Sequence, residues 1–259
     1  MLNNVRVVLV RPRFPENIGM AARAMANMGA SDLVLVDPER WEAEKAAPLA
    51  TSQGQPLLAS LRLADSLAGA LADCTAAIGT TARTGGWRKQ LLSPEKSALY
   101  ARRAVREGGR VAFVFGPEDR GLGNAEVELC TELVTIPTLS GHSSLNLAQA
   151  VLVLLYECVK ADMALPFTPA KERGWKRNPG GADSRRATLE EEAVLFAALE
   201  ETLLAIDHLP KDNPGWFMQP MRRFLRKSRL RRHEFDMIMG ICRQVQHKIG
   251  ADGKEQQDV

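Results

Sequence analysis

Short apolar runs alternate with amphipathic segments through the first 160 residues. Apolar and β-branched residues are concentrated at 5–10, 33–36, 61–64, 76–79, 111–115 and 133–136. Helical periodicity falls between these runs, near 17–28, 42–58, 66–72, 95–107 and 123–130. Because the runs lack the clean alternation of a half-exposed strand, they predict strands that are buried on both faces. The pattern therefore predicts an α/β domain over residues 1–160, with a parallel sheet and helices on both faces.

The last helix expected in this domain opens with an unusual set of polar residues. Residues 141–157 read GHSSLNLAQAVLVLLYE, and apolar side chains fill every side of the predicted helix, so we expect it to be buried. We expect Ser143 and Ser144 to cap its first N–H groups. Together with Asn146, these hydroxyls would form a polar socket against apolar packing.

Beyond residue 160 the pattern changes. Residues 161–187 are rich in proline, glycine and charge and have no periodicity, which predicts a linker. Thr188 and Glu191 have the spacing of a capping box and start a helical pattern, and a second helix is expected over 234–249. Residues 188–259 therefore predict a small all-helical domain, whose core is small enough to need support from a partner surface.

Composition narrows the class of protein. The chain has 259 residues, of which 45% are hydrophobic and 25% charged, as in ordinary globular proteins. No apolar run approaches the roughly 18 residues that cross a bilayer, and the start of the chain has no cleavage-site pattern, so we expect a cytoplasmic protein without membrane contact. The four cysteines and four histidines are widely scattered, so we expect neither a disulfide framework nor a metal site.

The positive charge of the chain is local. The net charge is +3, but residues 221–233 alone carry seven Lys or Arg and no acid, so the remainder is net negative. A basic block on such a chain suggests an anionic partner such as nucleic acid. The alternative is a solvated helix face that binds nothing.

Three glycine-rich or polar loops follow successive predicted strands. They are GTTART at 79–84, FGPEDRGLG at 115–123 and IPTLSGHSSLN at 136–146. Loops after parallel strands share the carboxyl edge of the sheet, where open α/β folds bind ligands. A dinucleotide site would instead need G-x-G-x-x-G after the first strand, and the residues there contain a single glycine. The pattern favours a ligand site at this edge and argues against a nicotinamide enzyme.

A fourth segment, PENIGMAARAMANMG at 15–29, predicts a helix that Asn17 caps and Gly29 ends. Arg23 lies about 140° round from the apolar residue Ile18 and so points away from the core. Small residues around Arg23 leave a backbone that another surface can approach closely.

Together these segments resemble a known family. Asn17-x-Gly19-x-x-x-Arg23, Phe115-Gly116-Pro117-Glu118-x-x-Gly121-Leu122 and Ile136-Pro137 followed by Ser143-Ser144-Leu145-Asn146-x-Ala148 are similar to the three motifs of SPOUT-class (TrmH/SpoU-type) RNA 2′-O-ribose methyltransferases. The helical tail is similar to that of the TrmJ branch, which methylates cytidine or uridine 32 of tRNA. Alternatives within the resemblance are an inactive RNA-binding relative and an rRNA methyltransferase.

The resemblance implies a C-terminal trefoil knot in the α/β domain, S-adenosylmethionine as the methyl donor and a homodimer. It implies that the donor is bound by Thr80, Thr81, Ala82, Gly116, Glu118, Ile136, Ser143, Ser144 and Leu145. It implies catalytic roles for Arg23, Asn17, Ser144 and Asn146. The basic block would grip tRNA phosphates through Arg222, Arg223, Arg226, Lys227, Arg229, Arg231 and Arg232.

The role of Arg23 has two interpretations. The mechanism proposed for the family makes this arginine the general base, aided by the substrate phosphate. A guanidinium has a pKa above about 12 and resists deprotonation, so we prefer Arg23 as a clamp for the phosphate that orients the hydroxyl.

Overall fold

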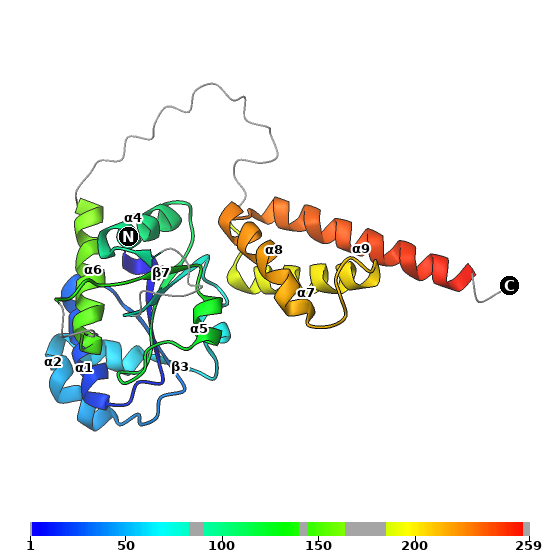
Figure 1. Ribbon diagram of the computed structural model, residues 1–259. Coiled ribbons are helices and arrows are strands. Elements are labelled where there is room, and N and C mark those ends of the chain that lie inside the picture. Colours follow the sequence, from blue (N-terminus) through cyan, green and yellow to red (C-terminus); the bar gives the residue numbers. More distant parts are fainter. Residues whose placement is uncertain (1, 83–90, 140–144, 164–184, 256–259) are drawn as a thin grey trace, which may run out of the picture. The chain divides into compact units, whose positions relative to one another are not determined.

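The computed structural model describes residues 2–82, 91–139, 145–163 and 185–255 (Figure 1). The chain divides into two compact units, residues 1–172 and 173–259. The first unit is α/β and the second is all-helical, as the periodicity predicts. In the described part of the chain, no helix is both long enough and apolar enough to cross a bilayer.

A parallel sheet forms the centre of the first unit. Its strands are β1 (Val5–Val10), β2 (Asp32–Val36), β3 (Arg62–Ala64), β4 (Ala76–Thr80), β5 (Leu91–Leu92), β6 (Val111–Phe115) and β7 (Glu132–Val134). They are ordered β3-β2-β1-β6-β4-β7-β5, and every pairing is parallel. All residues of β1 and β6 are buried, which confirms the prediction of strands covered on both faces. The sequence pattern missed β5, which is too short to produce a periodicity.

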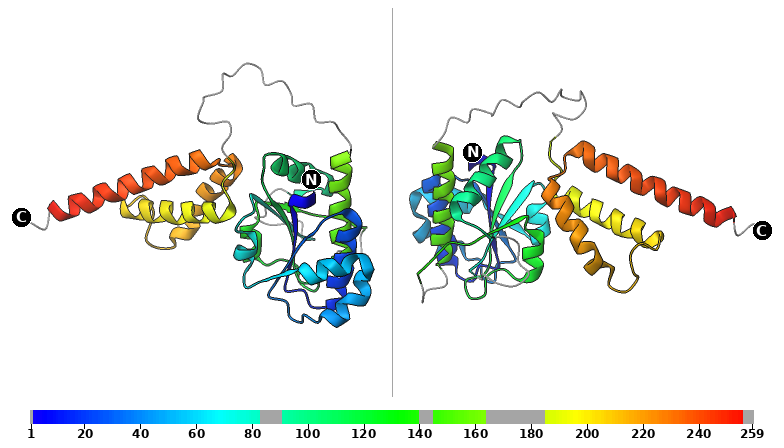
Figure 2. Two further views of the ribbon diagram at one scale, coloured as in Figure 1. Left: turned by 180° about the vertical axis from the view of Figure 1, so that it is seen from behind. Right: turned by 45° about the horizontal axis from the view of Figure 1, so that its top comes forward.

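Helices cover both faces of this sheet (Figures 1 and 2). They are α1 (Pro15–Met28), α2 (Ala43–Ser60), α3 (Leu67–Leu71), α4 (Pro94–Arg106), α5 (Asn124–Leu129) and α6 (Leu147–Met163), after a short 3-10 turn at Leu2–Asn4. α1, α2, α4 and α6 pack together on one face, and α3 and α5 lie on the other. The main hydrophobic core lies between the sheet and the layer of four helices, and it includes Ile18 of α1, Phe113 of β6 and Leu154 of α6.

Arg6 is buried inside the sheet. Its guanidinium is 1% exposed and donates hydrogen bonds to Asp73 at 2.6 Å and to Asp32 at 2.8 Å. Burial alone lowers the pKa of Arg6, but the hydrogen bonds to these carboxylates outweigh it, so the net shift is upward and the charge is retained. The ion pairs tie β1 to the start of β2 and to the turn before β4.

The surface that closely approaches the small residues of α1 is α2 of the same chain. A Cβ added at Gly19 would lie 2.1 Å from the carbonyl oxygen of Ala46, and one added at Gly54 would lie 3.0 Å from the backbone nitrogen of Arg23. Gly29 ends α1 in the left-handed conformation, with φ of 79°, as predicted. The two helices therefore pack backbone to backbone, and the Arg23 side chain remains exposed.

One prediction about α6 is wrong, and another concerns residues outside the described part of the chain. The helix begins at Leu147, and Asn146 caps it by accepting a 2.9 Å hydrogen bond from the N–H of Ala148. Ser143 and Ser144, expected as the caps, lie outside the described residues. The helix is also not buried on all sides, because Leu152 and Tyr156 are 39% and 52% exposed. Its apolar composition suggested complete burial, but one apolar side is left at the surface.

The second unit consists of α7 (Leu189–Ala205), α8 (Pro214–Ser228) and α9 (Arg232–Glu255). Leu195, Phe196, Leu225 and Phe235 belong to its buried core. The basic block spans the second half of α8 and the start of α9, which is longer than the predicted 234–249.

The two described ends of the expected linker belong to folded elements. Residues 161–163 continue α6. Ala187 donates a backbone hydrogen bond to Leu230, and Arg232 donates one to Arg185, so this stretch pairs with the α8–α9 connection. Residues 164–184 lie outside the described part of the chain.

Glu191 holds the start of α7. The predicted capping box is present: the Thr188 hydroxyl accepts from the N–H of Glu191 at 3.2 Å, and the Glu191 carboxylate accepts from the N–H of Thr188 at 2.9 Å. The same carboxylate pairs with Arg185 and Arg232. Hydrogen bonding by Arg185, with help from Thr188 and Arg232, lowers the pKa of Glu191 from 4.5 to about 2.

We therefore expect acid to weaken the second unit through Glu191. The folded-state pKa lies below the ordinary value, so the unfolded chain binds the proton more tightly and stability rises with pH. This contribution is complete above about pH 4.5 and is lost as the pH falls toward about 2. Glu191→Gln should lower the unfolding free energy of this unit by about 1–3 kcal/mol at neutral pH. Urea unfolding followed by circular dichroism measures it, and an equal effect of the exposed Glu190→Gln would contradict it.

Candidate active site

The three predicted loops begin side by side at the carboxyl edge of the sheet. β4 lies between β6 and β7. The Thr80 hydroxyl donates to the carbonyl of Val114 on β6 at 3.1 Å, and the N–H of Thr81 donates to the carbonyl of Val134 on β7 at 3.0 Å. The loops after β4, β6 and β7 therefore begin at one place, which confirms the prediction that they share the carboxyl edge of a parallel sheet.

The loop after β6 folds back on itself at Gly116. A Cβ at this position would lie 2.3 Å from the carbonyl carbon of Gly121 and from the nitrogen of Leu122. Gly121 has φ of 66°, and its N–H donates to the carbonyl of Pro117 at 2.8 Å. Bare backbone therefore forms this part of the edge, and any side chain at position 116 would force the loop open.

The resemblance implies that Gly116 contacts S-adenosylmethionine, and on this expectation Gly116→Ala should weaken donor binding at least about tenfold, because the loop must shift away from its backbone contacts. Calorimetric titration of the variant measures the affinity. Gly108→Ala is the control, since a Cβ there meets no atom within 4 Å and the residue is remote from this edge, although its φ of 83° carries local strain. Unchanged donor affinity in Gly116→Ala would show that this loop is not part of the donor site.

Asn17 connects the first motif to the other two. Its side-chain amide donates to Glu118 at 2.7 Å, and its amide oxygen accepts from the side-chain amide of Asn146 at 2.9 Å. The other oxygen of Glu118 accepts from the backbone N–H of Arg13 at 3.1 Å. Asn17 itself is 8% exposed, and its hydrogen bonds connect the start of α1 to the loops after β6 and β7.

The predicted capping role of Asn17 is wrong. Phe14 occupies the N-cap position of α1 and Pro15 the first helical position, so Asn17 already lies inside the first turn. Its side chain is thus available for Glu118 and Asn146. Sequence reasoning could find the three polar residues but not their mutual hydrogen bonds, which join positions more than 100 residues apart.

Arg23 lies on the exposed side of α1, as the helical periodicity predicts. Among the described residues, its guanidinium makes no hydrogen bond or ion pair. A planar cation with unused donors suits a phosphate that arrives from outside the subunit. α1 also packs against α6, whose exposed Leu152 and Tyr156 lie at the surface of the same helical layer.

Comparison with protein families identifies both units. The model described as "SpoU rRNA Methylase family" matches residues 4–156, and "tRNA methyltransferase TrmJ, C-terminal domain" matches residues 190–256. The chain belongs to the SpoU methylase family. Asn17, Glu118 and Asn146 all lie in its SpoU part, and α7–α9 form its TrmJ-type part.

Relatives over nearly the full length support this placement. The chain is 37% identical over 246 residues to a tRNA (cytidine/uridine/adenosine-2′-O-)-methyltransferase TrmJ of Pseudomonas aeruginosa, covering 95% of each chain. It is 33% identical to a tRNA (cytidine/uridine-2′-O-)-methyltransferase TrmJ of Klebsiella pneumoniae, covering 96% of this chain and 98% of the relative. The crystal structure of TrmJ from Z. mobilis ZM4 matches with a TM-score of 0.73 at 31% identity, covering 93% of this chain and 98% of that one. The resemblance to the TrmJ branch is confirmed.

Ion pairs connect other loops at the same edge of the SpoU unit. Arg13 pairs with Asp119 at 3.0 Å and with Glu39 at 3.3 Å, and Arg120 lies 3.6 Å from Glu39. These groups are about half exposed, so each pair contributes little to stability. The carboxylates of Glu39 and Asp119 offset the charges of Arg13 and Arg120, so this edge is not a uniformly positive surface.

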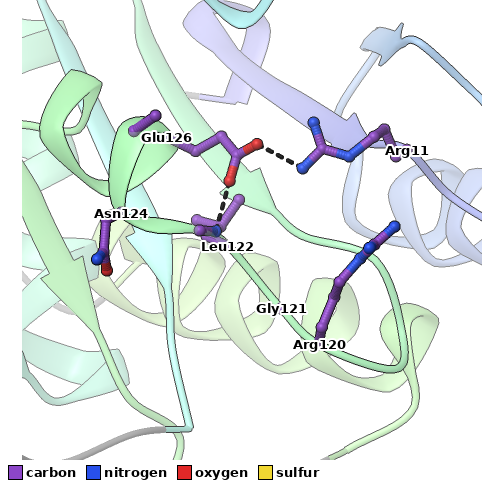
Figure 3. Close-up of a pocket in the computed structure, with 8 residues that line it drawn as sticks. Arg11, Arg120, Gly121, Leu122, Asn124 and Glu126 are labelled. Atoms are coloured by element: carbon purple, nitrogen blue, oxygen red, sulfur yellow. Dashed lines mark hydrogen bonds and ion pairs between the residues drawn. The ribbon is translucent and has the colours of Figure 1, made fainter.

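A pocket of about 360 Å³ opens beside the loop after β6 (Figure 3). Arg11 and residues 120–126 line it, and the Glu126 carboxylate accepts from Arg11 and from the N–H of Gly123. Neither Arg11 nor Glu126 was predicted as a site residue, although an arginine directly after the first strand was a usable signal. None of the residues expected to bind the donor lines this pocket.

The structure brings together many of the residues that the resemblance selects. Thr80, Thr81, Gly116 and Glu118 are partly buried at the carboxyl edge, and Ile136 follows β7. Ala82, Leu145 and Asn146 are more exposed. Their roles toward a methyl donor stay predictions, and Ser143 and Ser144 lie outside the described residues.

Proposed function

We propose that this protein transfers a methyl group from S-adenosylmethionine to a ribose 2′-hydroxyl of tRNA, on cytidine or uridine 32 of the anticodon loop. The observation that carries the proposal is that Asn17, on the same helix as the exposed Arg23, is hydrogen-bonded to Glu118 and Asn146 of the other two motifs. The substrate class is supported by the TrmJ-type tail and by relatives named as tRNA 2′-O-methyltransferases.

The donor site is proposed at the meeting point of the three loops. The bare backbone at Gly116, together with strand-end peptide groups beside Thr80 and Thr81, fits a flat and partly polar ligand such as the donor. The full proposed set is Thr80, Thr81, Ala82, Gly116, Glu118, Ile136, Ser143, Ser144 and Leu145. When bound, S-adenosylmethionine supplies a methyl group on a sulfonium, and transfer of this group disperses charge, so alignment of the reactants contributes much of the rate.

The chain's own residues provide that alignment. Glu118 holds Asn17, and Asn17 holds Asn146 at the cap of α6, so the three motifs keep one geometry. Arg23 binds the phosphate next to the target ribose and orients its hydroxyl. A guanidinium keeps its proton at neutral pH, so we assign Arg23 to positioning and not to proton abstraction.

We propose a homodimer in which Arg23 of one subunit faces the donor site of the other. Leu152 and Tyr156 lie one turn apart on α6 and leave apolar surface for a second copy, next to the helix that carries Arg23. The proposal includes a trefoil knot in the part of the SpoU unit that contains β4, β6, β7 and α6, and a location in the cytoplasm. Sedimentation that shows an active monomer would contradict the shared site.

Methyl transfer from labelled S-adenosylmethionine to bulk tRNA tests the function. We expect label in tRNA and, by nucleoside mass spectrometry, less 2′-O-methylcytidine or 2′-O-methyluridine in the tRNA of a deletion strain, and mass spectrometry of nuclease fragments should place the loss at position 32. Binding of tRNA without transfer would indicate an inactive RNA-binding relative. Label in rRNA but not in tRNA would indicate an rRNA methyltransferase.

A further inference from the structure

One exposed face of α8 is aromatic. Trp216, Phe217 and Phe224 are 65%, 44% and 69% exposed, and Pro220, also exposed, lies between them. At about 100° per residue these four positions fall on one side of the helix. The rings of Trp216 and Phe217 pack edge to face, with centroids 4.9 Å apart. Large exposed aromatic side chains gathered on one face indicate a binding surface.

The opposite side of α8 packs against the rest of the unit. Met218 and Leu225 are buried, and Leu225 joins the core formed by α7 and α9. The aromatic face is therefore not needed to hold α8 in place.

Some cations of the basic block pair with acidic residues of the same unit, and others face solvent. Arg222 pairs with Glu200 at 3.0 Å, Arg226 lies 3.7 Å from Glu192, and Arg232 pairs with Glu191. These arginines are engaged within the unit.

Arg223 and Lys227 project from the aromatic face. Both are exposed, and each lies within about 20° of Trp216 around the helix axis. In the described part of the chain, neither side chain makes a hydrogen bond, an ion pair or a ring contact. The face thus combines π surfaces with two cations that have no carboxylate partner there.

We infer that this face of α8 binds unpaired bases of RNA, by stacking on Trp216 and Phe224 while Arg223 and Lys227 hold the adjoining phosphates. The inference rests on the proposed function and names the part of the tRNA that the tail recognises, a single-stranded loop. Aromatic side chains stack on any base, and the bases of a duplex are already stacked and inaccessible. Trp216 and Phe224 are eight residues apart, or about 12 Å along the helix, which leaves room for more than one nucleotide.

RNA matches both the exposed rings and the positive charges of this face better than a protein partner does. An apolar protein surface would cover the rings but leave the charges of Arg223 and Lys227 desolvated and unpaired. A purely phosphate-binding surface would not need exposed rings. An unpaired nucleotide supplies a π face and an anion at adjoining positions.

Equilibrium binding of the full-length protein to tRNA, over a series of salt concentrations, tests the inference. Trp216→Ala/Phe224→Ala should weaken binding about tenfold or more and leave the slope of log affinity against log salt unchanged, because stacking releases no counterions. Arg223→Gln/Lys227→Gln should weaken binding and reduce that slope by about 1–2. Trp216→Leu/Phe224→Leu, which keeps apolar bulk but removes the rings, should behave like the alanine pair.

Two controls distinguish a loss of base stacking from a general loss of structure or of RNA affinity. Met237→Ala/Ile241→Ala removes apolar side chains that are 60% and 57% exposed on α9 and should leave tRNA affinity unchanged. Affinity for a perfect RNA duplex should be the same in the wild type and in Trp216→Ala/Phe224→Ala.

The outcomes are distinct. Wild-type methylation of tRNA with normal tRNA affinity in both ring variants would overturn the inference and leave the proposed function standing. Equal loss of tRNA and duplex binding, or a changed sedimentation coefficient with unchanged RNA affinity, would also overturn it. A wild-type protein that binds tRNA through these rings but transfers no methyl group would instead overturn the proposed function.

Discussion

Arg23→Ala should lower the rate of tRNA methylation about 100- to 1,000-fold and leave affinity for S-adenosylmethionine unchanged. Arg23 is exposed on α1, and its donors make no bond within the described residues, so its removal should not disturb the fold. The loss arises because an oriented charge on the substrate phosphate disappears, and one such contact has an effect of this order. Single-turnover transfer with labelled donor measures the rate, and calorimetry measures donor affinity.

Matched variants sharpen this test. Asn27→Ala alters an exposed residue one turn further along the same face of α1 and should behave as the wild type. Arg23→Lys keeps the charge but loses the planar fork, so we expect only partial recovery. Near-native transfer by Arg23→Ala would contradict both a clamping role and a base role.

Mixed dimers can test whether the site is shared. Arg23→Ala subunits alone should be nearly inactive, and Gly116→Ala subunits alone should be nearly inactive at a donor concentration far below their weakened Kd. If each site takes Arg23 from one subunit and the donor loop from the other, a random mixture should regain roughly a quarter of wild-type activity. No recovery in verified mixed dimers would place both residues in the same subunit's site.

Asn17→Asp should be the most damaging isosteric change in the site. The amide that donates to Glu118 at 2.7 Å would become a carboxylate, and two like charges at this distance in a buried position repel. One carboxyl of the pair should take a raised pKa in the folded state. We expect about 2 kcal/mol less stability of the SpoU unit at neutral pH and at least about 100-fold slower methylation.

The pH dependence identifies the cause. A carboxyl with a raised folded-state pKa binds its proton more tightly when folded, so the destabilisation is present above that pKa and diminishes as the pH falls through it. Below that pH, one protonated carboxyl donates to the other and the connection is restored. Urea unfolding of the wild type and the variant over a pH series measures the difference. Asn27→Asp makes the same exchange at an exposed position of α1, and an equal effect there would contradict the explanation.

The periodicity of the chain predicted much of the fold because burial controls where apolar residues recur. β1 and β6 are covered on both faces and therefore read as continuous apolar runs. The capping box at Thr188 and Glu191 and the glycine at the end of α1 were predictable because their chemistry is local.

Predictions failed where a residue's partner lies far along the chain. Asn17 had the composition of a cap, but Pro15 starts the helix and leaves the Asn17 side chain to Glu118 and Asn146. Composition likewise suggested a fully buried α6, whereas packing against α1 and α4 covers only part of its surface. Arg222 and Arg223 are adjacent in the basic block, yet one pairs with Glu200 and the other faces solvent.

The sequence by itself determined the element types and the carboxyl-edge position of the three loops, since these follow from spacing and side-chain identity. Only the tertiary structure decided the order of the strands, the hydrogen bonds of Asn17 and the direction of each cation on α8. The physical reason is that local spacing fixes which face of a helix or strand a side chain occupies. The packing of distant segments then determines whether that face meets a carboxylate, an amide or water.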